Sequence, residues 1–384
     1  MNLKFSEIPS PCFVLEERAL LKNLRLIDHV QKTAGAKIIL ALKAFSMFST
    51  FSIIRKFLSG TTASSLNEAR LGFEEFGGEV HAYSPAYPEN EFNELVHICN
   101  HITFNSMNDY TKYKSMIKKA GKKISCGLRI NPEYSEVKNP MYNPCVTGSR
   151  LGLRAESITE LPEGIEGLHF HTLCECDSFA LERTLKAVEE KFGKFFSSIK
   201  WLNFGGGHLM TRSDYDVNHL IGLLKEFKNR YPHLEIILEP GSAVGWQTGF
   251  LISTILDIID YGELKTLVVD TSFSAHLPDC LEVPYKPVIR GATILENQEE
   301  QKSLQTYRIG GLTCLAGDWC GDYIFEKTPQ SGDRIIFEDM IHYTMVKTTT
   351  FNGVNLPSIG IIRENGNFEL VKKFGYADFR NRLS

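Results

Sequence analysis

Lys43 is the residue whose surroundings first suggest chemistry. It stands near the C-terminal end of the apolar run IILALKAF, residues 38–45, which we predict to be a buried strand. A buried ammonium without a partner costs several kcal/mol or more. In apolar surroundings the amine loses its proton more easily and becomes a nucleophile suited to forming a Schiff base with an aldehyde. The sequence therefore indicates a reactive amine here, although a lysine at a strand end can also snorkel to the surface.

Three other features, a pair of histidines, a glycine triplet and a glutamate, also stand at the ends of apolar runs. Together with Lys43 they could bind the chemical groups of one cofactor. An imidazole can stack on a flat ring, consecutive glycines let backbone N–H groups approach a phosphate, and a carboxylate can hold a pyridine nitrogen protonated. With the amine, these features suit pyridoxal phosphate, whose aldehyde, phosphate and ring nitrogen need such partners. Taken singly, each has a structural explanation as a core histidine, a turn or a strand exit. The residues are His169 and His171 in HFH, Gly205, Gly206 and Gly207 in FGGG, and Glu239 in EPG.

The elements that must position these groups alternate along the first two thirds of the chain. Eight apolar runs are separated by amphipathic segments, which predicts an α/β fold with a (β/α)8 TIM-like barrel whose site lies at the C-terminal strand ends. A doubly wound open sheet is the competing interpretation, but its glycine-rich turn usually follows the first strand rather than a late one. The runs are 38–45, 60–65, 79–85, 101–105, 124–131, 167–172, 201–207 and 235–241, and the amphipathic segments include 65–76, 90–100, 106–121, 180–196 and 216–231.

After about residue 250 the chain contains short, β-branched, turn-bounded segments, which predict a C-terminal antiparallel β domain. The N-terminal strand 11–16, which precedes a predicted helix at 17–35, could join that domain. We therefore expect a barrel at 25–250 and a β domain at 251–384 together with 1–24. The long irregular piece 132–150 is expected to be a functional loop. The predicted strands of the β domain are 266–270, 333–339, 342–349 and 359–365.

Composition excludes several classes of protein. The chain has 384 residues, 43% hydrophobic and 23% charged, with a formal net charge of −4 and no strongly basic stretch, so binding to nucleic acid or to a membrane is not expected. The start lacks a basic segment followed by a long apolar run, which favours a cytoplasmic protein. Nine scattered cysteines indicate reduced thiols. Cys174 and Cys176 lack a second pair at ligand spacing, so no metal site is predicted.

Several strings resemble the barrel-fold, alanine-racemase-like pyridoxal phosphate decarboxylases, a group that includes ornithine, arginine and diaminopimelate decarboxylases. They are ALKA, HFH, FGGG, EPG, GLTCLAGD (311–318) and HYTMVKTTTFNG (342–353). The resemblance implies a homodimer with shared active sites, and it implies a role for each matching residue. Lys43 would carry the cofactor, His171 would stack on its ring, Gly205, Gly206 and Gly207 would hold the phosphate, Glu239 would bind the ring nitrogen, Cys314 would donate a proton across the dimer interface, Tyr343 would lie by the phosphate, and residues 351–353 would support the site.

The departures from that group point to one of its branches. Ser242 follows EPG where relatives usually have arginine, Leu315 follows the cysteine where ornithine-type enzymes have aspartate, and HTLCE (171–175) replaces His-Val-Gly-Ser. Several long strings resemble the carboxynorspermidine (carboxyspermidine) decarboxylases of polyamine biosynthesis, which make norspermidine or spermidine. They are HFHTLCE, WLNFGGGH, EPGSAVGWQTG, DTSFSAHLPDCLEVPY (270–285), TCLAGD and HYTMVKTTTFNG. Such a substrate is a small cationic amino acid with a polyamine tail, whose ammonium groups need carboxylates. The candidates are Asp279, then Glu175 and Asp318.

Other functions stay open at this point. The chain could decarboxylate another basic amino acid, such as diaminopimelate, or it could be a decarboxylase-like regulator without activity. The presence of Lys43, the glycines and Cys314 speaks against a regulator. An alanine racemase would have arginine rather than Glu239 at the ring nitrogen. A phosphate-binding barrel without pyridoxal phosphate would show no absorption band from a lysine-linked cofactor.

Overall fold

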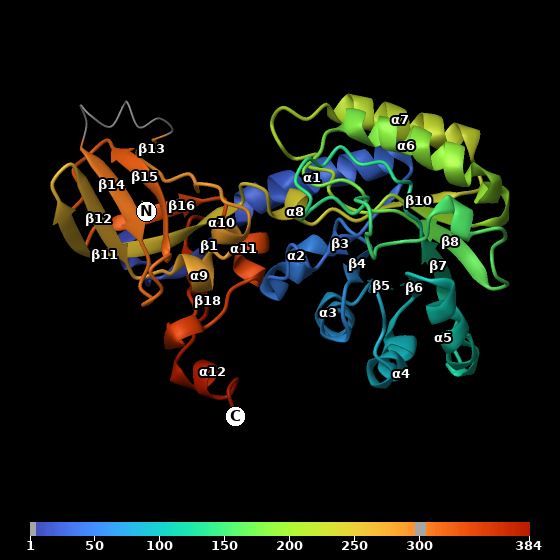
Figure 1. Cartoon of the computed structure of the whole chain (residues 1–384), viewed down its shortest axis with the longest axis horizontal. Coiled ribbons are helices and arrows are strands. Elements are labelled where there is room, and N and C mark those ends of the chain that lie inside the picture. The colour runs from blue at the N-terminus through green and yellow to red at the C-terminus, as the bar shows by residue number, and fades with distance from the viewer. Residues whose placement is uncertain (1–4, 296–304) are drawn as a thin grey trace. The chain divides into compact units, whose positions relative to one another are not determined.

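The computed structural model describes residues 5–295 and 305–384, and the chain divides into two compact units (Figure 1). The first unit comprises residues 23–244, and the second comprises residues 1–22 and 245–384. None of the helices in the described part of the chain is long and apolar enough to cross a membrane.

The first unit is built around one all-parallel sheet. Its strand order is β2-β10-β9-β8-β7-β6-β5-β4-β3. The two ends of this order, β2 and β3, flank the single residue Ile39, whose N–H donates to the carbonyl of Leu238 in β10 at 3.0 Å. The two segments therefore act as one strand, and the sheet closes into the predicted eight-stranded barrel instead of leaving the free edges of an open sheet. The strands are β2 (Lys37–Ile38), β3 (Leu40–Ala41), β4 (Gly60–Ala63), β5 (Glu79–Tyr83), β6 (His101–Phe104), β7 (Ser125–Arg129), β8 (Ile165–His169), β9 (Trp201–Asn203) and β10 (Glu235–Leu238).

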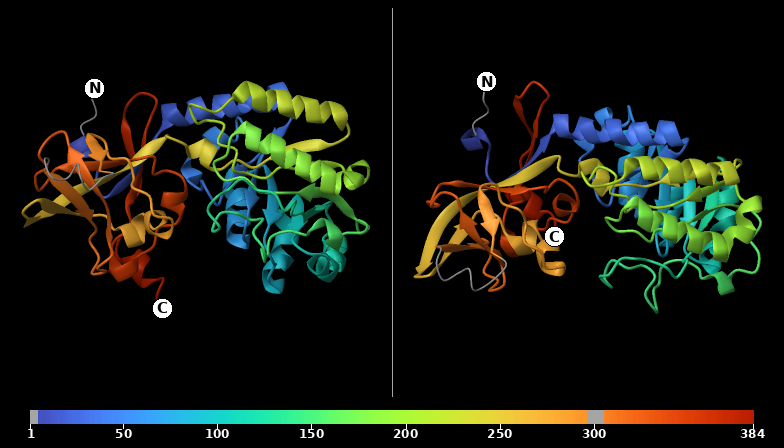
Figure 2. Two further views of the ribbon diagram at one scale, coloured as in Figure 1. Left: turned by 45° about the horizontal axis from the view of Figure 1, so that its top comes forward. Right: turned by 90° about the horizontal axis from the view of Figure 1, so that it is seen from above.

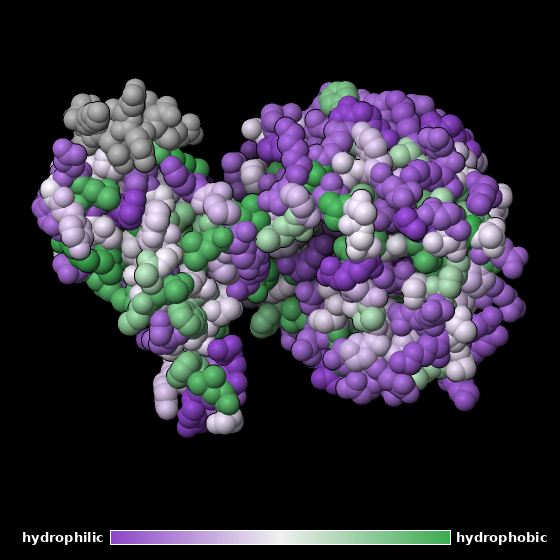
Figure 3. Space-filling view, in the orientation of Figure 1, coloured by the Kyte–Doolittle hydropathy of each residue, from purple (hydrophilic) through white to green (hydrophobic). Residues whose placement is uncertain are grey.

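Helices surround this barrel, and their starts follow from the sequence. Ser65, Ser106, Asp177 and Asp216 each cap a helix by accepting a backbone N–H of the first turn, a contact worth about 1 kcal/mol. α6 and α7 lie side by side on the barrel exterior in each view (Figure 2), and the face of this unit that Figure 3 shows is mostly polar. The helices are α1 (Glu17–Ala34), α2 (Phe51–Ile54), α3 (Leu66–Leu71), which continues as a π-helical turn to Phe76, α4 (Glu89–Ile98), α5 (Met107–Lys119), α6 (Ser178–Phe192), α7 (Val217–Arg230) and α8 (Ser242–Gly245).

Trp201 occupies a space in the barrel that neighbouring glycines leave open. A Cβ atom at Gly127 would come within 2.2 Å of the indole, and one at Gly167 within 2.0 Å. The indole N–H donates to the Ser125 hydroxyl at 2.8 Å. A side chain at either glycine would therefore displace the indole and disturb strands β7 and β8, which carry residues of the site.

The second unit contains the predicted β domain. Most of its strand pairs are antiparallel, but β1 pairs with β17 and β12 with β14 in parallel. The N-terminal strand β1 lies between β11 and β17, as expected from the sequence. The strands are β1 (Cys12–Glu16), β11 (Gly249–Tyr261), β12 (Leu264–Val269), β13 (Ala292–Ile294), β14 (Thr306–Gly310), β15 (Trp319–Phe325), β16 (Arg334–Glu338), β17 (Ser358–Ile362) and β18 (Phe368–Lys372).

The prediction of a strand at 342–349 was wrong. This segment forms the short helix α11 (Tyr343–Val346), and the unit has further short helices at α9 (Phe273–His276), α10 (Asp279–Glu282) and α12 (Tyr376–Arg380). The Thr344 hydroxyl donates to Asp279 in α10 at 2.7 Å, and the Thr349 N–H donates to the carbonyl of Ala275 in α9. These contacts with α9 and α10 override the β-branched composition that favoured a strand.

Candidate active site

Lys43 lies just beyond the first barrel strand rather than within it. β3 ends at Ala41, and the N–H groups of Ala44 and Phe45 both donate back to the Ala41 carbonyl, which makes a turn. Leu42, Ala44 and Phe45 are buried, whereas the Lys43 side chain is reached by solvent. The turn thus anchors the backbone with apolar side chains and presents the amine at the C-terminal end of the barrel.

The Lys43 amine lies beside the imidazole of His171, with 3.3 Å between Nζ and Nε2. The other ring nitrogen, Nδ1, accepts the Gly206 N–H at 2.7 Å, so a neutral imidazole carries its proton on Nε2 and offers it to the amine. Protein atoms surround the amine closely enough that desolvation lowers the pKa of Lys43, and the Arg129 guanidinium lowers it further. Burial and the nearby lysine hold the pKa of His171 well below its usual value. The imidazole is therefore neutral, and the Lys43 amine gives up its proton more readily than an exposed lysine does.

Glu239 directly follows β10, and its buried carboxylate accepts a hydrogen bond at one oxygen and faces an imidazole with the other. Asn203 donates its amide to Oε1 at 2.7 Å, and Nε2 of His169 lies 3.5 Å from Oε2. Burial alone would raise the pKa of Glu239, but the contacts with His169 and the hydrogen bond from Asn203 outweigh it and lower that pKa. Burial lowers the pKa of His169, so its imidazole is neutral. We therefore attribute its lowering of the Glu239 pKa to the dipole of the ring instead of a full positive charge. Glu239 is consequently an ionised carboxylate held in one orientation.

The three glycines form the turn after β9, and their geometry excludes side chains. Gly205 and Gly207 have φ of +69° and +84°. A Cβ atom at Gly206 would lie 2.4 Å from the Glu239 carbonyl oxygen, and one at Gly207 would lie 2.1 Å from the Leu173 carbonyl oxygen. The N–H groups of Gly205 and Gly206 already donate to Asn203 and His171. Within the described residues the Gly207 N–H has no such acceptor, so it is the amide of this turn that can bind an anion.

Sequence reasoning missed Arg129 as a member of this cluster. It is buried at the end of β7, donates Nη2 to the His171 carbonyl at 3.1 Å, and places its guanidinium carbon 4.6 Å from the centre of the Tyr83 ring. Its sequence context, the apolar run ISCGLRIN, contained the same signal that singled out Lys43, a cation in an apolar strand. Asn203 was missed because an asparagine at a strand end has no distinctive pattern.

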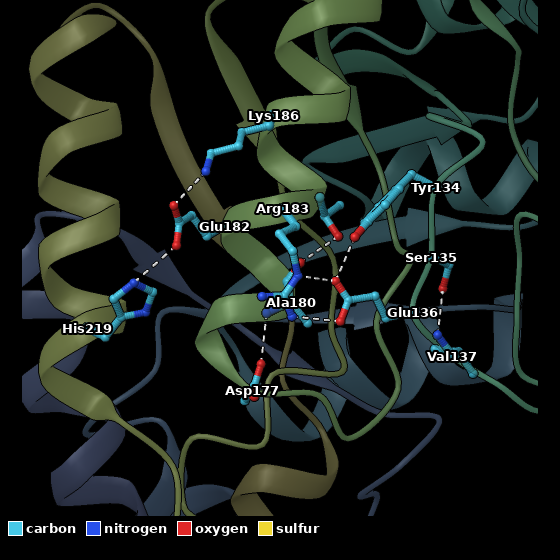
Figure 4. A network of polar contacts seen from close by, with 11 residues as sticks. Tyr134, Ser135, Glu136, Val137, Asp177, Ala180, Glu182, Arg183, Lys186 and His219 are labelled. Carbon is cyan, nitrogen blue, oxygen red and sulfur yellow. Dashed lines mark hydrogen bonds and ion pairs between the residues drawn. The ribbon is translucent and has the colours of Figure 1, made fainter.

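The predicted functional loop 132–150 is pinned to the barrel exterior by a polar network (Figure 4). Glu136 accepts the Tyr134 hydroxyl at 2.7 Å and the Nε and Nη2 groups of the Arg183 guanidinium from α6. Ser135 donates its hydroxyl to the Thr172 carbonyl at 2.6 Å, next to His171. The loop therefore supports the backbone that carries the imidazole.

Among the predicted site residues of the second unit, Cys314 and Asp318 lie on one loop. Cys314 carries an exposed free thiol, and its backbone N–H donates to the Asn352 side chain at 3.2 Å. Asp318 is buried, and each of its oxygens accepts two hydrogen bonds from Ser272, Ser274 and Thr313. The Asp318 carboxylate thus shapes the loop that presents Cys314, and its contacts leave little capacity for a substrate ammonium.

Asp279 is the first residue of α10 and is only partly used by its neighbours. Its Oδ2 accepts the hydroxyls of Tyr285 at 2.9 Å and Thr344 at 2.7 Å. Its Oδ1 is buried and has no hydrogen-bond partner among the described residues. Tyr343 is the residue next to Thr344 in α11, so this bond places α11 beside Asp279. Glu175, in the barrel unit, is exposed and has φ of +52°, and Arg212 donates to its carbonyl.

One cluster at the other end of the barrel has metal-ligand residue types. The ligand atoms of Glu79, His81 and His101 all lie within 4.8 Å of one another. However, the Lys37 amine is 3.0 Å from a Glu79 oxygen and supplies the positive charge there. The two imidazoles stack 4.0 Å apart and nearly parallel, so their in-plane lone pairs do not converge on one point. The arrangement is an ion pair with stacked rings.

Comparison with known proteins shows the family to which the chain belongs. A family model described as "Pyridoxal-dependent decarboxylase, C-terminal sheet domain" matches residues 13–341. These are enzymes that use pyridoxal phosphate, and the closed barrel with its amine and carboxylate is consistent with that class. The chain belongs to the pyridoxal-dependent decarboxylase family.

The individual relatives indicate which members of this family the chain is similar to. The chain is 51% identical to carboxyaminopropylagmatine decarboxylase of Synechocystis sp., over all of this chain and 97% of that protein. It is 42% identical to carboxynorspermidine/carboxyspermidine decarboxylase of Campylobacter jejuni, over 98% of this chain and 99% of that protein. The crystal structure of the C. jejuni carboxynorspermidine decarboxylase complexed with norspermidine matches with a TM-score of 0.90, covering 98% of this chain and 100% of that one. Diaminopimelate decarboxylase of Helicobacter pylori, at 16% identity and a TM-score of 0.83, shares the fold.

The residues at the barrel mouth fit pyridoxal phosphate. An amine with a lowered pKa suits its aldehyde, the ionised Glu239 suits a protonated ring nitrogen, and the Gly207 N–H, which has no acceptor among the described residues, suits its phosphate. The His171 imidazole lies beside the amine, where a flat ring linked to Lys43 would be within reach of it. Each chemical group of the cofactor therefore has a counterpart in this unit.

Proposed function

We propose that this decarboxylase removes the α-carboxyl group from a carboxylated polyamine, with carboxynorspermidine or carboxyspermidine as the substrate class. The observation that carries the proposal is full-length identity of 42% and 51% to two enzymes whose substrates share this chemistry. Serine instead of arginine after EPG and leucine after Cys314 depart from ornithine-type enzymes and support the same choice.

Carboxyaminopropylagmatine is the second candidate substrate, favoured by the 51% identity to the Synechocystis enzyme. It differs from the other two by ending in the guanidinium of agmatine instead of an ammonium. A planar guanidinium offers several N–H donors in a fork, whereas an ammonium is a compact point charge. The buried, unpaired Oδ1 of Asp279 can accept from either one.

In this proposal the residues of the barrel mouth act together. Pyridoxal phosphate, when bound, supplies an aldehyde that links to amines and a ring that accepts the electrons left when carbon dioxide departs. Lys43 would hold the aldehyde of the cofactor through its amine. Glu239 would keep the ring nitrogen protonated, and His171 would lie beside the ring. Asp279 binds the cationic tail, with Glu175 and Asp318 as weaker candidates.

Cys314 donates the proton that replaces carbon dioxide at the α-carbon, and we propose that it comes from the partner subunit of a homodimer. Cys314 is exposed on its loop, and Lys43 belongs to the other unit of the chain. Mixing inactive Lys43→Ala and Cys314→Ala chains under exchange conditions should restore about a quarter of wild-type activity, since half of a random mixture is heterodimer with one intact site in two. No recovery despite demonstrated exchange would reject the shared site. The cytoplasmic location expected from the sequence stays a prediction.

The test of the substrate is a comparison of kcat/KM for carboxynorspermidine, carboxyspermidine, carboxyaminopropylagmatine and meso-diaminopimelate on the purified enzyme. The first two differ by one methylene, a difference worth about 1–3 kcal/mol in a typical pocket. We expect the polyamine compounds to exceed diaminopimelate by a wide margin. Preference for the agmatine compound would select the second candidate, and preference for diaminopimelate would refute the proposal. No turnover of any compound would favour a non-catalytic regulator.

A further inference from the structure

We propose that Asn203 and His169 are positioning residues for Glu239, and that Asn203 ties this carboxylate to the glycine turn. The inference rests on the role proposed above for Glu239 at the ring nitrogen. Asn203 was not identified from the sequence, and His169 was singled out there together with His171 but was given no role of its own.

Asn203, Gly205 and Glu239 form a closed ring of hydrogen bonds. Asn203 is the last residue of β9 and is buried. Its Nδ2 donates to Glu239 Oε1 at 2.7 Å, and its Oδ1 accepts the Gly205 N–H at 2.8 Å. The ring closes through the backbone, where the Glu239 N–H donates to the Gly205 carbonyl at 2.8 Å. One side-chain amide thereby sets the carboxylate after β10 relative to the turn after β9.

This connection joins the two ends of the cofactor site. Gly205 is followed by Gly206, which donates to His171, and by Gly207, whose N–H is available to an anion. If Asn203 shifts, both the carboxylate for the ring nitrogen and the turn for the phosphate lose their common anchor. A carboxylate in this place needs such an anchor, because a free rotamer would misplace its charge.

His169 completes the arrangement at the second oxygen. Its Nε2 lies 3.5 Å from Glu239 Oε2, and its ring is buried beside Tyr83, with 5.4 Å between ring centres. The aromatic contact restricts the imidazole, whose Nε2 has no hydrogen-bond partner among the described residues. Glu239 Oε1 thus accepts one hydrogen bond from Asn203, and Oε2 faces the imidazole of His169 at a longer distance.

The chemistry requires an amide at position 203 rather than an acid of the same shape. An aspartate there would place a second carboxylate oxygen about where Nδ2 lies, 2.7 Å from Glu239. Two carboxylates so close share a proton, because both cannot stay ionised. Glu239 would then be partly protonated and would no longer favour a protonated ring nitrogen.

The experiment frees the Asn203→Asp enzyme of cofactor and measures its binding of two ligands, pyridoxal phosphate and an analogue in which a C–H group replaces the ring nitrogen; kcat is measured after reconstitution with pyridoxal phosphate. Loss of a charge-assisted contact should weaken pyridoxal phosphate binding and lower kcat by about 10- to 150-fold. Affinity for the analogue should change little, because the aspartate keeps an oxygen that can accept the Gly205 N–H and hold the turn, and because the analogue has no nitrogen for Glu239 to bind. Equal losses for both ligands would mean that Asn203 has only a structural role, and would overturn the inference.

Controls separate this inference from the role of Glu239. Glu239→Gln should alter the ratio of the two affinities in the same direction, and an unchanged ratio there would refute the role of Glu239 itself. If Glu239→Gln changes the ratio and Asn203→Asp does not, the positioning inference alone fails. Asn23→Asp is the matched control, since Asn23 is a buried asparagine of the same unit that donates to the Val244 carbonyl instead. It should leave the ratio unchanged.

Two further variants keep the inference testable if Asn203→Asp folds poorly. Asn203→Ala removes the donor without adding charge, so it should change the ratio in the same direction by a smaller factor. At position 169, Gln retains an N–H donor and Phe does not. His169→Gln should therefore preserve the ratio better than His169→Phe, and equal ratios for these two variants would exclude a positioning role for His169.

Discussion

Two buried carboxylates, one in each unit of the molecule, show how contacts separate a chemical role from a structural one. Glu239 at the barrel mouth and Asp318 in the sheet unit are 8% and 4% exposed. Glu239 accepts a hydrogen bond from Asn203 and faces His169, and its unit also presents an amine and an imidazole. Asp318 accepts four hydrogen bonds from the loops that surround it. Burial is the same in kind, but only Glu239 lies in a cluster of reactive groups.

Asp279 is intermediate between these two carboxylates. One of its oxygens holds Tyr285 and Thr344, and the other is buried without a partner among the described residues. A buried oxygen without a donor costs free energy unless a ligand satisfies it. The comparison therefore ranks the three proposed tail-binding acids: Asp279 has the unused acceptor, Glu175 is exposed, and Asp318 is already satisfied.

The largest expected effect is the loss of the barrel-mouth amine. Lys43→Ala should remove the covalent cofactor link and nearly all turnover, because no other group supplies the nucleophile. The absorption band of the lysine-linked cofactor and the decarboxylation rate measure both effects. Lys37→Ala is the matched control, since Lys37 pairs with Glu79 and Glu235 at the other end of the barrel. An undiminished band in Lys43→Ala would refute the assignment.

The acid with the unused oxygen should show the next largest effect. Asp279→Asn should lower kcat/KM for the polyamine substrate by about 10- to 150-fold, the value of one charge-assisted hydrogen bond. The cofactor absorption should not change. Glu282→Gln in the same helix, where the glutamate pairs with Lys347, is the control. Unchanged kcat/KM for Asp279→Asn would indicate that Glu175 binds the polyamine tail instead. A lost absorption band would show that Asp279 supports the fold.

Asp318→Asn should reverse this pattern and mainly reduce stability. The neutral amide replaces a charged acceptor of four hydrogen bonds, so the free energy of unfolding should fall by about 1.5–3 kcal/mol. Denaturant unfolding of the apoenzyme measures that loss, and kcat/KM reports the effect on the substrate. A large rise in KM with unchanged stability would contradict the structural role and restore Asp318 as a substrate ligand.

The smallest expected effect concerns the stability of the apoenzyme against pH. Folding lowers the pKa of Lys43 from its ordinary value of 10.5, so the unfolded chain binds more protons and the wild type gains stability as pH rises toward that value. Lys43→Met lacks this group. The variant should therefore melt at a higher temperature than the wild-type apoenzyme near pH 7, and the difference should shrink toward pH 10.5. A difference independent of pH would show that the amine is not desolvated.

Much of the barrel could be predicted because its signals are local. Six of the eight apolar runs contain a whole barrel strand, the run 38–45 contains most of the pair β2 and β3, and the run 167–172 covers only the last three residues of β8; the amphipathic segments match α3 to α7. Strand ends were less accurate: β3 ends at Ala41, while the apolar run continues to Phe45. The run continues because the turn after the strand is buried too, and hydrophobicity alone does not distinguish a buried strand from a buried turn.

By itself, the sequence determined the alternation of strands and helices, the order of the strand ends and the types of reactive side chain, because these follow from periodicity, turn residues and spacing along the chain. Only the tertiary structure decided which groups share hydrogen bonds. Asn203 and Glu239 are 36 residues apart, and His171 and Lys43 are 128 residues apart. Closing the barrel brings their strand ends together, and this proximity, with the desolvation it causes, sets the tautomer of His171 and the ionisation of Glu239. No local pattern encodes either property.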